Sequence, residues 1–152
     1  MLGTNPYPFI RLTDQVIKWA DKTGEHVIIQ SGNTPISNSQ IETHPFIDHS
    51  KLMDLMSQAR IVITQGGFGS LQDCIQNGAK TVAVPRLVEL GESNDDQTEI
   101  VRALAEQNLV IPLYDEKQLE TAIEAAMQLN RKTSNKSELP KHVAETINTF
   151  IK

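Results

Sequence analysis

The chain has 152 residues, which is enough for one ordinary domain and too few for two. Hydrophobic residues make up 39% and charged residues 22%, a composition typical of a soluble globular protein that needs no disulfide or metal in order to fold. A net charge of −5 argues against a protein whose main partner is nucleic acid, because neutralising phosphates requires clustered Lys and Arg.

Cysteine content and hydropathy indicate the compartment. The single cysteine, Cys74, cannot form an internal disulfide, which indicates a reducing environment. No apolar run approaches the roughly 18 residues of a membrane span, and the N-terminal residues lack the basic and apolar regions of a signal peptide. We therefore expect a cytoplasmic protein.

Short β-branched runs alternate with amphipathic stretches, a pattern that predicts βα units around a parallel sheet. In chain order we expect a helix at 9–23, a strand at 26–30, a weaker strand at 41–44, a helix at 50–58, a strand at 60–64, a helix at 70–77, a strand at 81–84, a helix at 95–107, a strand at 109–112 and a helix at 117–129. A polar linker at 130–137 precedes a final helix that starts at 139 or 140 and ends at 150. The expected fold class is α/β, in a single domain over 1–152.

The first residues do not fit this alternation. Met1 and Leu2 are too few for a central strand, yet the following Gly3-Thr4-Asn5-Pro6 is typical of the turn after one. Either the first strand is incomplete, or the fold tolerates a strand of only these two residues, which we call the N-terminal stub. The sequence leaves both interpretations open.

The most informative segment is the glycine-rich run from Gln65 to Ser70, between an apolar strand and a helix. Its glycines lie where the backbone turns sharply and where amide N–H groups at a helix N-terminus suit a phosphate or a ribose. The alternative is purely structural, because Ser70-x-x-Asp73 fits a helix capping box. The run matches neither the dinucleotide GxGxxG nor the P-loop pattern, so no motif supports a nicotinamide or ATP site.

A second polar loop lies at 85–97, after the next strand. Loops on a rigid scaffold often carry binding residues, although Ser93 or Asn94 as an N-cap would explain the acidic residues here. Capping does not explain Gln97. The adjacent acids Asp95 and Asp96 lack further ligands at suitable spacing, so we expect no metal site. The four histidines are scattered and form no pattern of nucleophilic catalysis.

Together these segments resemble a known family. The runs VITQGGFGSLQDCIQNGAKTVAVP and GESNDDQTEIVRALAEQ are similar to the C-terminal, donor-binding half of family 28 glycosyltransferases of the GT-B type. GTNPYPFIRLTDQV, VIIQSGNT and PFIDHSKLMDLMSQA also lie where that family has its first glycine turn, second strand and mid-domain loop. The resemblance is to small catalytic subunits of two-component transferases, such as those of bacterial exopolysaccharide synthesis and of dolichol-linked N-acetylglucosamine transfer. It implies a Rossmann-like parallel sheet with helices on both faces.

The resemblance also implies roles for individual residues. Asp73 matches the acidic residue that binds the ribose hydroxyls, and Gln97, preceded by Asp96, matches a glutamine near the donor sugar and phosphates. The remaining implied substrate-binding residues are Gly67, Phe68, Gly69 and Ser70 at the diphosphate or ribose, Phe46 and Ile47 at the uracil, and Thr4 at a phosphate. The pattern departs at Gln65, where many relatives have His, and the short first strand weakens the case for Thr4.

The function that the resemblance implies is UDP-sugar binding within a heteromeric transferase. The chain would transfer a hexose or N-acetylhexosamine to a lipid-linked or polysaccharide-precursor acceptor, with UDP-sugar as its donor substrate and neither cofactor nor metal. The general base matches no residue here and is expected on a membrane-anchored, acceptor-binding partner, which would hold the chain at the inner face of the membrane. The alternative is a non-catalytic module that binds a nucleotide and docks such a subunit, and a sugar-epimerase-like half fold is a weaker third reading.

Overall fold

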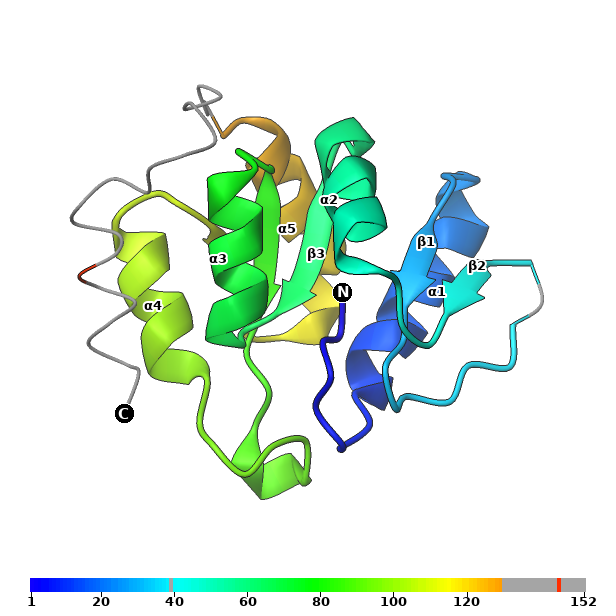
Figure 1. Cartoon of the computed structure of the whole chain (residues 1–152), viewed down its shortest axis with the longest axis horizontal. Coiled ribbons are helices and arrows are strands. Elements are labelled where there is room, and N and C mark those ends of the chain that lie inside the picture. Colours follow the sequence, from blue (N-terminus) through cyan, green and yellow to red (C-terminus); the bar gives the residue numbers. More distant parts are fainter. Residues whose placement is uncertain (39, 130–144, 146–152) are drawn as a thin grey trace.

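The computed structural model describes residues 1–38, 40–129 and 145 (Figure 1). The α-helices in this part are α1 (Ile10–Thr23), α2 (His49–Gln58), α3 (Phe68–Gln76), α4 (Thr98–Glu106) and α5 (Leu119–Met127). The strands are β1 (Ile28–Gln30), β2 (Glu42–His44), β3 (Val62–Gln65), β4 (Thr81–Val84) and β5 (Ile111–Pro112), and short 3-10 turns lie at Val88–Leu90 (η1) and Glu116–Gln118 (η2). The structure confirms the predicted α/β class.

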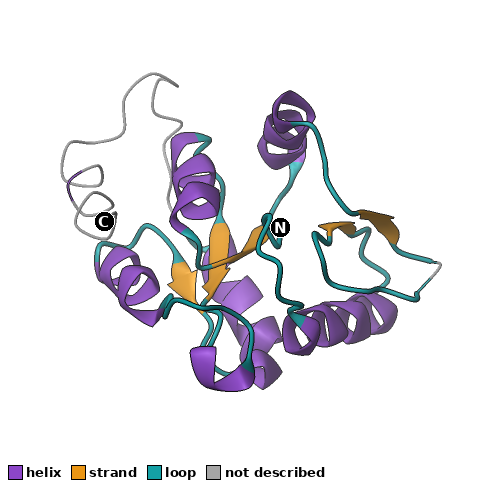
Figure 2. Cartoon of the chain, turned by 60° about the horizontal axis from the view of Figure 1, so that its bottom comes forward, coloured by secondary structure: helices purple, strands orange, loops and turns teal. Residues whose placement is uncertain are grey.

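The strands form two parallel sheets rather than one. β1 pairs with β2, and β3, β4 and β5 pair in that order. The chain's N-terminus lies between the two sheets (Figures 1 and 2). Met1 exchanges backbone hydrogen bonds with β3, and the Leu2 N–H donates to Gln30 O of β1. The stub therefore takes the place of a central strand, and the spatial order is β2, β1, stub, β3, β4, β5.

Helices cover both faces of the three-stranded sheet because successive side chains of a strand point to opposite faces. Val82 and Val84 of β4 belong to the core cluster that includes α1 and α5 side chains, whereas Ala83 packs with α3 and α4. A third cluster joins Met56 of α2 to β3 and α3. Parallel strands covered on both sides read as continuous apolar runs, which is why the sequence revealed them.

The predicted bounds need correction mainly at the first residues of the strands and at the N-termini of α3 and α4. β1 and β3 begin two residues later than predicted, α3 begins two residues earlier, and α4 begins three residues later, at Thr98. The weaker strand is confirmed as β2. Cys74 is completely buried, as a packing residue would be. The predicted linker at 130–137 and nearly all of the predicted final helix lie outside the described residues.

Within residues 1–38, 40–129 and 145, none of the helices has the length and apolar content needed to span a bilayer.

Candidate functional site

The loops that follow β1, β2, β3, β4 and the N-terminal stub lie at one edge, because all these segments run parallel. The first turn is held tightly there. Gly3 has a positive φ of 63°, and a Cβ at this position would lie 2.1 Å from Gln65 Nε2. Only glycine fits this backbone, so the turn after the stub contacts the start of the glycine-rich loop directly.

Hydrogen bonds from the Arg86 side chain hold the loops at this edge together. Arg86 is the second residue after β4, and it is almost completely buried, with 1% exposed. Nε donates to Gln65 Oε1 at 2.6 Å, while the terminal nitrogens donate to the backbone oxygens of Leu2, Tyr7 and Glu92 at 2.8–3.0 Å. Burial lowers the Arg86 pKa to about 10, partly opposed by Glu92, so the guanidinium remains charged at neutral pH.

A second arginine, Arg11 at the start of α1, joins that helix to the loop after β4. Arg11 forms a two-pronged ion pair with the buried Glu92, with N–O distances of 2.7 and 3.1 Å. Glu92 also accepts the Leu87 N–H, and both arginines lie over the Phe9 ring, at 5.1 and 4.7 Å from its centroid. Bidentate, charge-assisted bonds of this kind hold loop backbones in one arrangement.

The helix after the glycine-rich loop begins without a side-chain cap. α3 starts at Phe68, and its N-cap is Gly67, which has no side chain. The predicted capping box is therefore wrong: Ser70 lies inside the first turn, so it cannot be the cap. Gly69 and Phe68 are exposed, and nothing lies within 4 Å of where a Cβ on Gly69 would be. The N-terminus of α3 thus lacks a side-chain cap and carries two exposed residues, and a helix N-terminus of this kind attracts anions.

Gln97 lies beside this loop. It is the N-cap residue of α4, and its Oε1 accepts the Arg86 backbone N–H at 3.0 Å. Its side chain approaches both loop glycines, because a Cβ on Gly66 would lie 3.2 Å from Gln97 Oε1 and one on Gly67 would lie 3.7 Å from Gln97 Nε2. The structure therefore brings Gln97 and the glycine-rich loop together.

The acidic residues before α4 make local turns. Asp96 accepts the Thr98 N–H at 2.7 Å, and this bond holds the Asp96 pKa below its usual range. Ser93 accepts the Asp95 N–H in a similar turn. The predicted N-cap at Ser93 or Asn94 is wrong, because α4 begins only after Gln97; the Asn94 side chain instead accepts the Tyr7 hydroxyl.

Asp73 lies on the second turn of α3, away from the loop amides, with 26% of its side chain exposed. Its carboxylate is 3.5 Å from Nε2 of His49, the first residue of α2. This contact brings the segment with Phe46 and Ile47 beside α3, since both precede α2 by only a few residues. Phe46 is 57% exposed, whereas Ile47 is half-buried. Thr4 is exposed on the first turn.

Sequence reasoning missed the residues that hold the site. Neither Arg86 nor His49 was singled out, and Gln65 was noted only as a departure from the family pattern. A lone arginine two residues after the buried strand at 81–84 was the one available signal for Arg86, since charged residues are rarely buried unless paired. Among the described residues, no group of three or more His, Cys, Asp or Glu side chains is placed to hold a metal ion.

Known proteins resemble this chain in sequence pattern and in fold. The glycosyltransferase family 28 C-terminal domain matches residues 3–150. A crystal structure of the glycotransferase of kitacinnamycin has a similar fold, with a TM-score of 0.65 and 16% sequence identity. The match covers 98% of this chain and 36% of that chain, so this chain spans about a third of that protein's length. No curated protein matches the sequence significantly.

Proposed function

Because the chain belongs to the glycosyltransferase family 28 C-terminal domain family, we propose that it is the donor-binding subunit of a heteromeric UDP-sugar glycosyltransferase. It transfers a hexose or N-acetylhexosamine to a lipid-linked or polysaccharide-precursor acceptor. The observation that carries this proposal is the family match over residues 3–150. It is supported by the α3 N-terminus, which has no side-chain cap, has Gln97 beside it and carries Asp73 on the next helical turn.

Donor recognition uses three groups of residues in this proposal. The amides of Gly67, Phe68, Gly69 and Ser70 face the diphosphate, helped by Thr4 from the first turn and by Gln97 and Asp96 from the loop before α4. Asp73 accepts the two ribose hydroxyls, a task that suits a carboxylate because both bonds are charge-assisted. Phe46 and Ile47 contact the uracil, and their position beside Asp73 through the His49 contact supports this assignment.

The reaction is the displacement of UDP by an acceptor hydroxyl. The bond from the sugar C1 to the diphosphate oxygen breaks, the acceptor oxygen bonds to C1, and its proton passes to a general base on the partner. The α3 amides stabilise the negative charge that grows on the leaving diphosphate. In this scheme the charge is met by fixed dipoles of the protein, without a cofactor or a metal.

The partner in this proposal is a membrane-anchored subunit that binds the lipid-linked acceptor. The reaction site of a two-lobed GT-B enzyme lies in the cleft between its lobes. Exposed apolar side chains at Phe68 and on η1, at Val88 and Leu90, support docking of a second lobe at this edge. The subunit would then act at the inner face of the membrane while remaining a cytoplasmic protein.

Calorimetric titration of UDP tests the donor site. Asp73→Ala should weaken UDP binding by about 1 to 3 kcal/mol, the cost of losing charge-assisted hydrogen bonds. Asp21→Ala is the matched control. Asp21 is an exposed carboxylate near the C-terminal end of α1, so its substitution should leave the UDP affinity unchanged. Equal affinities of wild type and Asp73→Ala would contradict the ribose assignment.

Sugar transfer by the chain co-expressed with its membrane partner tests the enzymatic part. We expect transfer by the pair that Asp73→Ala and Gln97→Ala reduce. UDP binding without any transfer by the pair would favour a non-catalytic, nucleotide-binding module.

A further inference from the structure

Two glutamine side chains beside the α3 N-terminus are both held by Arg86. Gln65, the last residue of β3, accepts the Arg86 Nε–H through its Oε1 at 2.6 Å. Gln97, the N-cap residue of α4, accepts the Arg86 backbone N–H through its Oε1 at 3.0 Å. A single arginine therefore holds carboxamides that come from two separate segments of the chain.

These two bonds fix the direction of each carboxamide. A guanidinium N–H and a backbone N–H are donors only, so the atom that faces each of them must be the glutamine oxygen. The Nε2 atoms of Gln65 and Gln97 consequently point away from the Arg86 donors. None of the hydrogen bonds within the described part of the chain uses either Nε2, and each of these nitrogens carries two N–H donors.

The two amide nitrogens converge on Gly67. A Cβ on Gly67 would lie 2.9 Å from Gln65 Nε2 and 3.7 Å from Gln97 Nε2. Gly67 has a φ of −70° and a ψ of 138°, a backbone conformation that any residue adopts, so its conformation does not require glycine. The missing side chain instead leaves both nitrogens uncovered on this side.

The same glycine places the two nitrogens at a helix N-terminus. Gly67 is the N-cap of α3, whose first amides have no partner within the helix and no side-chain cap. Gln65 is only 7% exposed, so its free N–H groups are largely buried donors beside these backbone donors. Gln65 Nε2 is not among the completely enclosed unpaired atoms of the described residues, so a ligand can reach it. Such a set of donors suits a ligand with several acceptor oxygens.

The charge on Arg86 favours an anionic ligand. Burial lowers the Arg86 pKa only to about 10, so the guanidinium is charged at neutral pH. A charged donor on the oxygen of a carboxamide polarises the group and makes its N–H groups stronger donors. The nearest opposing carboxylate, that of Glu92, is directed to Arg11 and to the Leu87 N–H.

We propose that Arg86 is a positioning residue that directs the amide nitrogens of Gln65 and Gln97, together with the first amides of α3, onto one diphosphate group. Arg86 acts through the glutamines, because its other side-chain donors are used by three backbone oxygens. The inference rests on the proposed function for the identity of the ligand, a nucleoside diphosphate sugar. It adds Gln65 as a direct contact and Arg86 as the residue that orients both amides.

Replacing either glutamine by glutamate separates holding the loops from binding the ligand. One carboxylate oxygen still accepts the Arg86 N–H, so the loop arrangement is kept. The other oxygen takes the place of Nε2 and presents a negative charge to the phosphates instead of two donors. A residue that only holds the loops tolerates this change, whereas a residue that binds phosphate does not.

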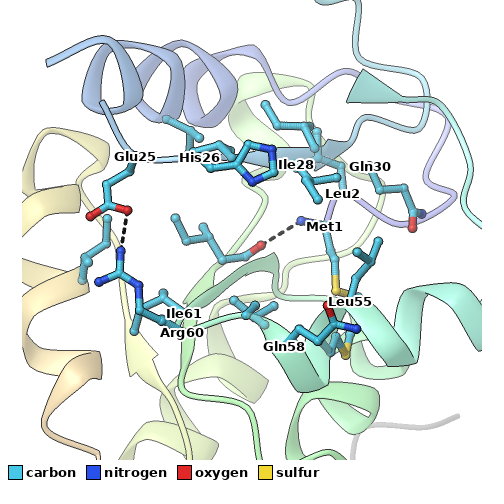
Figure 3. Close-up of a pocket in the computed structure, with 18 of the residues that line it drawn as sticks. Met1, Leu2, Glu25, His26, Ile28, Gln30, Leu55, Gln58, Arg60 and Ile61 are labelled. Carbon is cyan, nitrogen blue, oxygen red and sulfur yellow. Dashed lines mark hydrogen bonds and ion pairs between the residues drawn. The ribbon is translucent and has the colours of Figure 1, made fainter. Parts of the chain in front are cut away.

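The test measures the affinities of UDP and uridine for the whole chain and for its Gln65→Glu and Gln97→Glu variants. Calorimetry measures UDP binding, and NMR titration measures the weaker binding of uridine, which lacks the phosphates. The ratio of the two affinities therefore reports the phosphate contacts alone. Gln58→Glu is the matched control, because Gln58 is exposed at the C-terminal end of α2 and lies beside the apolar cavity between β1 and β3 (Figure 3).

We expect each of the two glutamate variants to lower the UDP affinity on the order of tenfold to a hundredfold and the uridine affinity by less than about twofold. Gln58→Glu adds the same charge and should change neither affinity. An unchanged UDP affinity in Gln65→Glu, or an equal loss for UDP and uridine, would overturn the inference while leaving the proposed function in place. A wild-type chain that binds neither ligand would overturn the proposed function itself.

Arg86→Lys tests the positioning step. Lysine keeps the backbone N–H that holds Gln97 but lacks the Nε that holds Gln65, so the ratio of UDP to uridine affinity should fall several-fold. Adding Arg86→Lys to Gln65→Leu should lower this ratio no further, because the amide to be oriented is already gone. An equal fall in both backgrounds, or an equal loss for both ligands, would show a purely structural role. If Arg86→Lys does not fold by circular dichroism, the two glutamate variants decide the proposal.

Discussion

At the scale of single residues, the candidate site depends on one buried guanidinium. Arg86 connects Gln65 on the glycine-rich loop, Leu2 on the stub and Tyr7 after the first turn. These partners lie up to 84 residues away in sequence. A planar group with five donors suits this role, because one side chain satisfies several acceptors in fixed directions.

We expect Arg86→Met to lower the free energy of unfolding by about 3 kcal/mol or more, because four acceptors, three of them in buried hydrogen bonds, lose their donor. Arg86→Lys should be almost as destabilising, since an ammonium lacks the planar fork. Urea denaturation followed by circular dichroism measures both. Arg102→Met, which removes an exposed arginine on α4, is the control and should change little. A stable Arg86→Met variant would show that the loops hold their arrangement without this residue.

At the scale of elements, the glycines at the junction of β3 and α3 have two different surroundings, which indicate two different roles. Gly66 is packed against α4, since a Cβ there would lie 2.7 Å from Val101 Cγ2. Gly69 lies in the first turn of α3 with open space around it. The fold therefore explains why residue 66 is glycine but gives no packing reason at 69, where alanine is the better helix former. A ligand that approaches the α3 amides supplies such a reason.

Two alanine substitutions separate these roles. Gly66→Ala should lower stability by about 1 to 3 kcal/mol through overpacking, and Val101→Ala in the same chain should recover part of that loss. Gly69→Ala should raise stability by about 0.5 to 1 kcal/mol and yet weaken UDP binding. Thermal unfolding and calorimetry provide the two measurements. Unchanged UDP affinity in Gly69→Ala would argue that the ligand does not approach this amide.

At the scale of the whole molecule, the two sheets are held together by a two-residue stub and the helices that cover it. The main core cluster extends from Ile29 of β1 to Val82 of β4, so side chains of α1 and α5 connect the two sheets through the core. Within the described part of the chain, Met1 and Leu2 provide backbone hydrogen bonds between the two sheets, with Met1 bonded to β3 and Leu2 to β1. The ionisation of the Met1 amine therefore bears on the stability of the entire fold.

Stability should rise with pH between about 6 and 8. Burial lowers the pKa of the Met1 α-amino group from 8.0 to about 6, so in this interval the unfolded chain binds a proton that the folded chain does not. The gain should be about 2 to 3 kcal/mol, complete above pH 8 and absent below pH 6. Denaturation at several pH values measures it, with an N-acetylated chain as control. The same slope after acetylation would assign the effect to other groups.

Much of the fold could be predicted because the strands and helices follow from patterns of neighbouring residues in the sequence. Apolar strands buried on both faces gave continuous β-branched runs, and even the weak strand at β2 was found. Helix starts were less predictable. The residues favoured as caps, Ser70 and Ser93, are not the caps, because the N-cap of α3 is Gly67 and that of α4 is Gln97. Tertiary contacts there outweigh the local preference for a side-chain cap.

The sequence by itself determined the α/β class, the family and the glycine-rich loop that carries the candidate site, because all three depend on residues close together along the chain. Only the tertiary structure decided what holds the site and where the sheet is interrupted. The bonds of Arg86, the contact of His49 with Asp73 and the hydrogen bond from Met1 to Ile63 O join segments that are 21 to 84 residues apart. Such pairings arise from burial and packing in three dimensions, and no local pattern encodes them.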